Sequence, residues 1–95
     1  MTKPMISNTY QRSSNAEAFE VEGEWVILHA DQYTVTKLNE VGGLIWSMLK
    51  AAQSPEALAD SLLNVYDITK QEAERDVEAF LGNLLRLGLI EYASK

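Results

Sequence analysis

The chain has 95 residues, with 8 Lys and Arg against 14 Asp and Glu, no cysteine and a net charge of −6 at pH 7. A chain of this length forms one small domain with a single apolar core. The lack of cysteine excludes disulfides, thiolate metal sites and cysteine nucleophiles, and it suits the reducing cytoplasm. The negative charge argues against a nucleic-acid partner, because affinity for phosphates comes mainly from Lys and Arg. No apolar run approaches the ~18 residues of a transmembrane helix, so we expect a cytoplasmic protein without a membrane partner.

The first half of the chain shows the two-residue period of β-strands. Residues 1–15 are polar and lack the apolar region of a secretory signal, so we expect a flexible arm with a short extended piece at 9–12. The domain is expected to cover 16–95. Phe19 and Val21 alternate with glutamates, which predicts a half-buried strand with both side chains on its inner face. Trp25–His29 and Tyr33–Leu38 are predicted as two further strands, which together form a three-stranded antiparallel meander.

The period changes to that of helices at Asn39, which is expected to cap a first helix. Two glycines at 42 and 43 cost this helix about 2 kcal/mol in propensity. We therefore expect another backbone segment or a bulky ring to pack closely against them, with Trp46 as the candidate ring.

Two more helices are expected after Ser54-Pro55 and after Thr69, where Glu72 completes a capping box. The third helix is predicted from Lys70 to about Leu87, and 89–92 form a short extended piece. The expected buried stripes consist of Leu58, Leu62, Val65 and Tyr66 in the second helix, and of Ala73, Val77, Phe80, Leu81, Leu84 and Gly88 in the third. A sheet followed by three helices predicts a small α+β domain of winged-helix-like layout.

No group of residues has the spacing of a catalytic or metal site. His29 ends a predicted strand without a Ser or an acid at a useful spacing, which indicates a half-exposed packing residue. The acidic residues of the sheet alternate with apolar ones instead of converging on a loop, so no metal or other cofactor is expected. This acidic cluster, Glu17, Glu20, Glu22, Glu24 and Asp31, can instead attract a basic partner. We expect no enzyme activity.

Two other classes of binding protein compete with peptide recognition. Asp60-Ser61-Leu62 resembles the phosphopantetheine site of acyl or peptidyl carrier proteins, but Ser61 lies within a predicted helix instead of at its start. A winged helix also suggests DNA binding, yet the third helix carries 3 basic and 4 acidic residues. By contrast, the predicted strand at 33–38 contains Thr and Val, has no proline, and offers an open edge to an extended peptide.

Two segments carry a family resemblance. Residues 38–46 read LNEVGGLIW, and residues 76–90 fit the pattern DVxxFLxxLxxxGLI. Together they resemble the PqqD-like family, over roughly residues 18–92. This family includes recognition elements of pathways that modify ribosomally made peptides. The resemblance implies a winged-helix-like fold of three strands and three helices, without catalytic activity. Asn39, Gly42 and Trp46 match its strongest part and are expected to cap, to allow close approach and to fill the core.

The resemblance further implies that the leader segment of a precursor peptide adds as a strand to the third strand, beside the third helix. The groove wall would include Asp76, Val77, Phe80 and Leu84. On a helical wheel the flank with Asp76, Phe80, Asn83 and Leu87 is expected to face the peptide, opposite the flank with Glu78 and Leu85. The expected peptide-binding residues are Gln32, Tyr33, Thr34, Val35, Thr36, Lys37, Leu38, Asp76, Phe80, Asn83, Leu84 and Leu87.

The resemblance therefore predicts a non-enzymatic adaptor that presents a leader to processing enzymes. A free-standing chain of this kind most resembles the leader-binding protein of lasso-peptide pathways. Its expected partners are the precursor leader and a leader peptidase or ATP-dependent cyclase of the same pathway. The alternative is a PqqD-like peptide chaperone for a radical-enzyme pathway such as PQQ synthesis.

Overall fold

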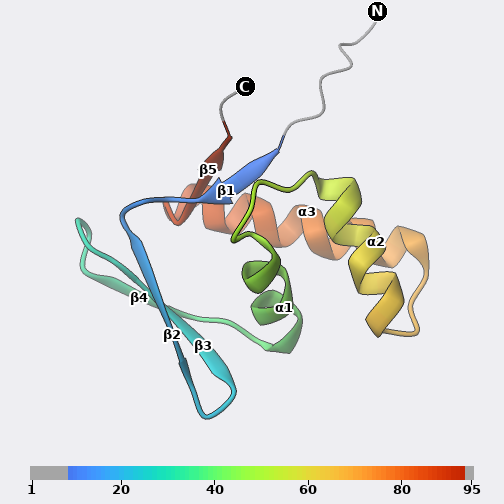
Figure 1. Cartoon of the computed structure of the whole chain (residues 1–95), viewed down its shortest axis with the longest axis horizontal. Helices are drawn as coiled ribbons and strands as arrows, with labels where there is room; N and C mark the ends of the chain where they lie inside the picture. Colours follow the sequence, from blue (N-terminus) through green and yellow to red (C-terminus); the bar gives the residue numbers. More distant parts are fainter. Residues whose placement is uncertain (1–8, 94–95) are drawn as a thin grey trace, which may run out of the picture.

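The computed structural model describes residues 9–93. Its elements are β1 (Tyr10–Arg12), β2 (Ala16–Val21), β3 (Glu24–His29), β4 (Thr34–Lys37), α1 (Glu40–Met48), α2 (Pro55–Val65), α3 (Lys70–Arg86) and β5 (Ile90–Tyr92). The strands β2, β3 and β4 form an antiparallel sheet in that order, and β1 pairs with β5. Figure 1 shows the three-stranded sheet on one side of α1 and α2 on the other, with α3 passing behind α1. The predicted α+β fold, with its three-stranded meander and three helices, is confirmed. No helix among the described residues is long and apolar enough to cross a membrane.

The three helices begin where side-chain caps satisfy their first amides. Asn39 Oδ1 accepts a bond from the Gly42 amide at 2.7 Å, and Ser54 Oγ accepts one from Ala57 at 3.1 Å. The capping box of α3 closes in both directions between Thr69 and Glu72. These local interactions supply partners for amides that have none within the helix. The predicted starts of all three helices are confirmed.

The core lies where the inner face of the sheet meets the three helices. Its largest fully buried side chains are Trp46, Ile27, Ile45, Leu49, Leu58, Leu62, Leu84, Leu89 and Val77. Each such side chain contributes about 1.5–3 kcal/mol when it leaves water. The guanidinium of Arg12 lies 4.6 Å from the Trp46 ring centroid and donates two hydrogen bonds to the Trp46 carbonyl, at 2.7 and 3.2 Å. Burial lowers the pKa of Arg12 from its usual value. The core role predicted for Trp46 is confirmed.

The two ends of the described chain pair with each other. Tyr10 lies opposite Tyr92 in the β1–β5 register, and their ring centroids are 5.1 Å apart. The extended pieces predicted at 9–12 and 89–92 are thus confirmed. Residues 10–12 belong to the domain instead of to a flexible arm, because they complete a two-stranded sheet. The rest of the predicted arm, residues 1–8, lies outside the described residues.

The inner face of β2 differs from the prediction. Phe19 and Val21 are 48 % and 55 % exposed, whereas Ala16 and Ala18 pack against the core. The small alanines leave room for Trp25, which is partly buried against the same core. The predicted two-residue period is confirmed, but the prediction that Phe19 and Val21 lie on the inner face is wrong, because Ala16 and Ala18 occupy that face. Val65, predicted in the buried stripe of α2, is likewise 59 % exposed at the end of that helix.

Candidate functional site

The outer edge of β4 has backbone groups that no described strand pairs. The Leu38 amide donates to the Trp25 carbonyl at 3.0 Å, which fixes the pairing parity of β3 and β4. In an antiparallel ladder, successive residues turn their backbone groups alternately toward and away from the neighbouring strand. Thr34 and Thr36 lie an even number of residues from Leu38, so their backbone groups also face β3. The N–H and C=O groups of Val35 and Lys37 therefore point outward, where they are available to an added strand.

The turn before β4 is shaped by a buried histidine. His29 is 6 % exposed, and its Nδ1 accepts bonds from the Asp31 and Gln32 amides, both at 3.2 Å. Tyr33 follows with a left-handed φ of 55°, and its amide donates to the His29 carbonyl at 2.9 Å. The prediction of a half-exposed packing residue is wrong for His29, because its ring packs against Gly88, where a Cβ atom would lie 3.1 Å from His29 Nε2. The strand begins at Thr34, one residue later than predicted, because Tyr33 belongs to the turn.

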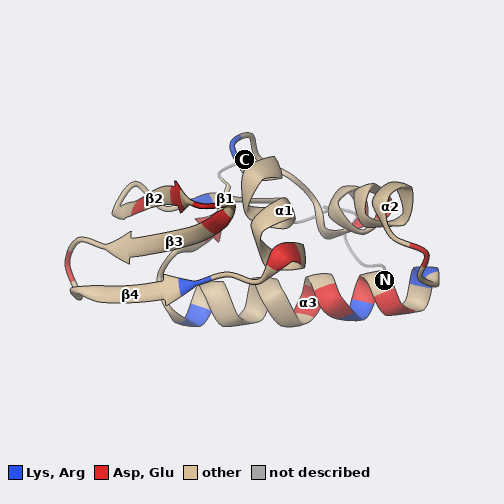
Figure 2. Cartoon of the chain, turned by 90° about the horizontal axis from the view of Figure 1, so that it is seen from below, with Lys and Arg blue, Asp and Glu red and all other residues tan. Residues whose placement is uncertain are grey.

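A hollow of about 310 Å³ lies beside the point where the chain leaves β4. In Figure 2 the end of β4 and the segment that follows it pass in front of the C-terminal half of α3. The hollow is lined by Asn39, Val41, Gly42, Asp76, Ala79, Phe80 and Asn83.

The Phe80 ring is held against the first turn of α1. A Cβ atom on Gly42 would lie 2.8 Å from Phe80 Cε1, closer than real Cβ contacts. On Gly43 a Cβ atom would lie 2.7 Å from Trp25 Cδ1. The predicted close approach to the two glycines is therefore confirmed, and of the two alternatives it is made by rings, but these rings are Phe80 and Trp25 instead of Trp46. The close approach predicted for Gly42 positions a side chain of the hollow.

The lining of the hollow combines apolar and polar groups. The Phe80 ring and Ala79 supply apolar surface, and the exposed carboxylate of Asp76 can accept hydrogen bonds. Asn83 lies one turn beyond Phe80 along α3, and its Oδ1 accepts a hydrogen bond from Arg86 at 2.8 Å. Such a lining suits a side chain with an apolar body and a hydrogen-bond donor at its end.

The structure brings only some of the predicted site residues together. Asp76, Phe80 and Asn83 share the hollow, whereas Leu84 is 2 % exposed and belongs to the core. A peptide on the surface cannot contact Leu84, so its assignment to the site is corrected. Leu38 is 9 % exposed and lies in the core, while Leu87 caps the far end of α3 with 37 % exposure. On the opposite flank, Glu78 lines a hollow beside α2 and Leu85 packs on the core.

Four lining residues were not predicted as contacts: Asn39, Val41, Gly42 and Ala79. Asn39 and Gly42 were assigned structural roles, which the structure confirms, but the same backbone also forms the wall of the hollow. The two adjacent glycines were the available signal. They indicated a ring at close range, and that ring is Phe80.

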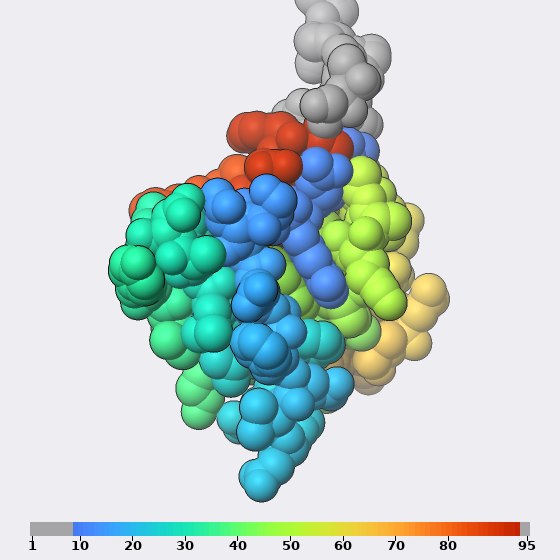
Figure 3. Space-filling model, turned by 60° about the vertical axis from the view of Figure 1, so that its left-hand side comes forward, coloured from blue at the N-terminus to red at the C-terminus, as the bar shows by residue number. Residues whose placement is uncertain are grey.

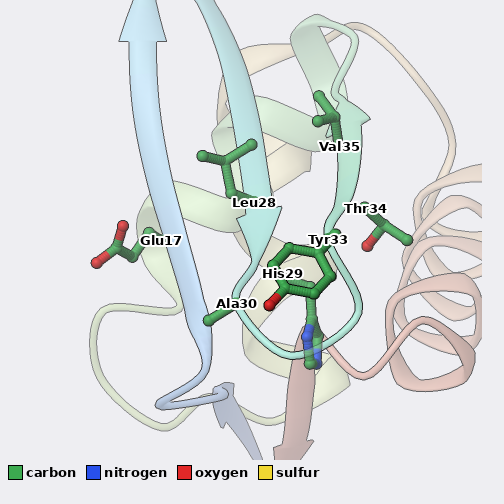
Figure 4. A pocket seen from close by; sticks show the side chains of 7 residues that line it. All are labelled: Glu17, Leu28, His29, Ala30, Tyr33, Thr34 and Val35. Atoms are coloured by element: carbon green, nitrogen blue, oxygen red, sulfur yellow. The ribbon is translucent and has the colours of Figure 1, made fainter.

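A second hollow, of about 330 Å³, lies on the other side of the β4 edge (Figure 4). Leu28 and Val35, on neighbouring strands, form its apolar floor, and Val35 is 65 % exposed. Tyr33 stands at the turn with 90 % of its surface exposed. A strand added to β4 would therefore place alternate side chains beside Phe80 and beside Val35.

The structure offers little support for the competing chemistries. Within residues 9–93, no three His, Asp or Glu side chains gather as a metal site would require. Ser61 lies in the middle of α2, and its Oγ donates to the Ala57 carbonyl at 3.1 Å. A carrier-protein serine would instead begin a helix.

The sequence matches the family model described as coenzyme PQQ synthesis protein D (PqqD) over residues 24–90. This region includes β3, β4, all three helices and the first residue of β5. The chain therefore belongs to the PqqD family. A comparison with curated proteins finds no match.

Two solved structures share the fold. One is described as TbiB1 in complex with the TbiA(beta) leader peptide; it is 29 % identical, with a TM-score of 0.81, covering 90 % of this chain and 99 % of that one. The other is described as lasso peptide synthetase B1 complexed with the leader peptide. It is 23 % identical, with a TM-score of 0.79, covering 86 % of this chain and 96 % of that one.

Proposed function

We propose that this protein is a non-enzymatic adaptor that binds the leader segment of a ribosomally made precursor peptide by strand addition to β4. The observation that carries the proposal is the open edge at Val35 and Lys37, together with the hollow beside Phe80, whose lining begins at Asn39, two residues after β4 ends. The similarity to TbiB1, a protein whose structure contains a leader peptide, supports the same assignment. Main-chain pairing supplies affinity in this mode of recognition, while pockets for alternate side chains supply selectivity.

The peptide would be held on three sides. Its backbone pairs with Val35 and Lys37, one set of side chains points toward Phe80 and Asp76, and the other set lies over Val35. The hollow beside Phe80 takes one anchoring side chain. Because the chain contributes position instead of chemistry, the adaptor acts by raising the local concentration of the precursor at its processing enzyme.

The pathway that fits best is lasso-peptide biosynthesis in the cytoplasm. Both solved structures described above are complexes with a leader peptide, and one of them is called a lasso peptide synthetase B1. In such a pathway the partners are a leader peptidase or an ATP-dependent cyclase. The match to the PqqD model favours a second candidate, a peptide chaperone for a radical-enzyme pathway such as PQQ synthesis.

Fluorescence polarisation tests the proposal directly. A labelled leader from the short precursor encoded beside this protein is titrated with the full chain, and the core segment of the same precursor is the control. Saturable binding of the leader alone supports the adaptor. Equal binding of both segments, or no binding by a chain with a cooperative melting transition, would contradict it. Titration with precursors of the two pathways separates the two candidates.

A further inference from the structure

The three-stranded sheet β2-β3-β4, which forms the wing of the fold, has a second open edge along β2. The Ala30 amide donates to the Asn15 carbonyl at 2.9 Å, which fixes the parity of the β2–β3 pair. The backbone N–H and C=O groups of Phe19 therefore face β3, whereas those of Ala18 and Glu20 point away from the sheet. The edge is distinct from that of β4, because β3 lies between the two strands.

A groove runs between this edge and α1. It consists of two adjoining hollows, of about 310 and 280 Å³, which share Trp25 and Ser47. Figure 3 shows this side of the molecule, with β2 in blue and the end of α1 in yellow-green. Ala18 lines one hollow and Glu20 the other, so the outward backbone groups follow the length of the groove.

The two ends of the groove carry opposite charges. Arg12 and Lys50 line one hollow, and Glu20 and Glu40 line the other. Arg12 is engaged with the Trp46 carbonyl. Lys50 is exposed and makes no ion pair among the described residues, whose single salt bridge joins Lys37 to Glu24. A free cation therefore marks one end and a pair of carboxylates marks the other.

We propose that this groove binds a second extended segment, from a partner protein, in which an acidic and a basic side chain lie four residues apart. Ala16 and Glu20 mark the two ends along β2, and four residues of strand span about 13 Å. An even spacing places both charged side chains on one face of the added strand. The acidic group then meets Lys50, the basic group meets Glu20, and the residue midway lies over Trp25.

A second copy of this chain fits the groove poorly. Pairing two β2 edges would bring strands together that each carry Glu17 and Glu20, and like charges across a strand pair are destabilising. Charge therefore favours a partner segment with both signs. The inference uses no residue of the β4 edge, so it stands or falls independently of leader binding.

Two capped heptapeptides of identical composition test the spacing. The first is Thr-Glu-Thr-Val-Thr-Lys-Thr, with Glu and Lys four apart. The control, Thr-Glu-Thr-Val-Lys-Thr-Thr, has them three apart and hence on opposite faces. Each is titrated into the full ¹⁵N-labelled chain by heteronuclear NMR at low salt. The first peptide should shift the amides of Ala18 and Glu20 and the indole of Trp25. The control should bind about fivefold more weakly, since it loses one surface ion pair.

Variants separate this groove from the leader site. Lys50→Glu should weaken the first peptide about fivefold and favour a peptide with two lysines four apart. Ala18→Pro should abolish binding, whereas Val35→Pro should leave it unchanged while impairing the leader. Three results would each overturn the proposal: equal affinity of the two peptides, absence of shifts with both, or shifts confined to β4 or to the exposed face around Phe19. Concentration-dependent dimerisation lost in Glu20→Pro would assign the edge to a second copy instead.

Discussion

Gly42 and Phe80 lie in such close contact that the glycine has no room for a side chain: a Cβ atom there would be 2.8 Å from the Phe80 ring. This contact sets the position of the ring that we propose as the wall of the leader groove. The residue that permits it lies in the first turn of α1, five residues after the end of β4, the strand that we propose as the peptide-binding edge. A change at the start of α1 would therefore alter the position of the Phe80 ring relative to β4.

Replacing Gly42 by alanine should displace the Phe80 ring and weaken leader binding. Overpacking costs about 1–3 kcal/mol, which exceeds the ~1 kcal/mol that alanine returns in helix propensity. Thermal unfolding should show a small net loss of stability, and fluorescence polarisation should show a lower affinity. Gly82→Ala is the matched control, because a Cβ atom there meets nothing within 4 Å. It should raise stability by about 1 kcal/mol without changing affinity. If Gly42→Ala binds the leader with unchanged affinity, the position of the Phe80 ring does not matter for leader binding.

Proline at Val35 should remove an outward amide that pairs with the leader. The loss of one main-chain hydrogen bond costs about 1 kcal/mol or more, so the dissociation constant should rise at least about fivefold. Glu20→Pro places the same change on the opposite edge and should leave leader affinity intact. Thr36→Pro instead removes an amide that pairs with β3, and it should lower the melting temperature. If Val35→Pro and Glu20→Pro bind the leader equally, β4 is not the pairing edge.

The Phe80 side chain should contribute to both stability and binding, and two substitutions separate the effects. Phe80→Ala removes the ring that contacts Gly42 and should cost up to about 3 kcal/mol of stability, because the side chain is only partly buried. Phe80→Leu keeps much of the packing volume and should retain the fold. Chemical denaturation measures the first effect and polarisation the second. A leader that binds Phe80→Leu and the parent chain equally would indicate that the ring serves packing alone.

Removing the His29 imidazole should loosen the turn that leads into β4. The ring is buried and its Nδ1 accepts two backbone amides, so His29→Ala leaves both without their partner and costs about 1–3 kcal/mol. Leader affinity should fall together with stability. Gln32→Ala, in the same turn, alters a side chain that is exposed and should leave stability unchanged. Hydrogen exchange of the Tyr33 amide, which donates to the His29 carbonyl, and of the Thr36 amide, which faces β3, measures the loosening. Unaltered exchange in His29→Ala would show that the turn holds without the ring.

The sequence predicts those parts of the fold that depend on neighbouring residues. The caps at Asn39, Ser54 and Thr69 act within four residues, so pattern alone locates each helix start. The inner face of β2 depends instead on what lies across the core. Trp25 fills that space, so alanines suffice there and the larger Phe19 turns outward. Periodicity shows that a strand alternates, but it does not show which face is covered.

The same division applies to the candidate site. The helical wheel grouped Asp76, Phe80 and Asn83 correctly around one hollow. It also placed Leu87 in that set, but Leu87 caps the end of α3 and does not line the hollow. The family resemblance added Leu84, whose side chain lies in the core. A wheel orders residues around an axis, and only the packing of α3 against its neighbours decides where the buried sector ends.

The pairing of β1 with β5 has a consequence for how this domain can be built into larger proteins. Tyr10 and Tyr92 lie opposite each other, so the described chain starts and finishes at one place. Neither strand takes part in the β4 edge, and β1 reaches the groove beside α1 only through its last residue, Arg12. A polypeptide attached before β1 or after β5 would therefore leave both binding edges of the wing open. The same recognition surface can serve a separate subunit or a module of an enzyme, and joining residues 93 and 9 by a short linker would give a circular permutant with new ends in an exposed turn.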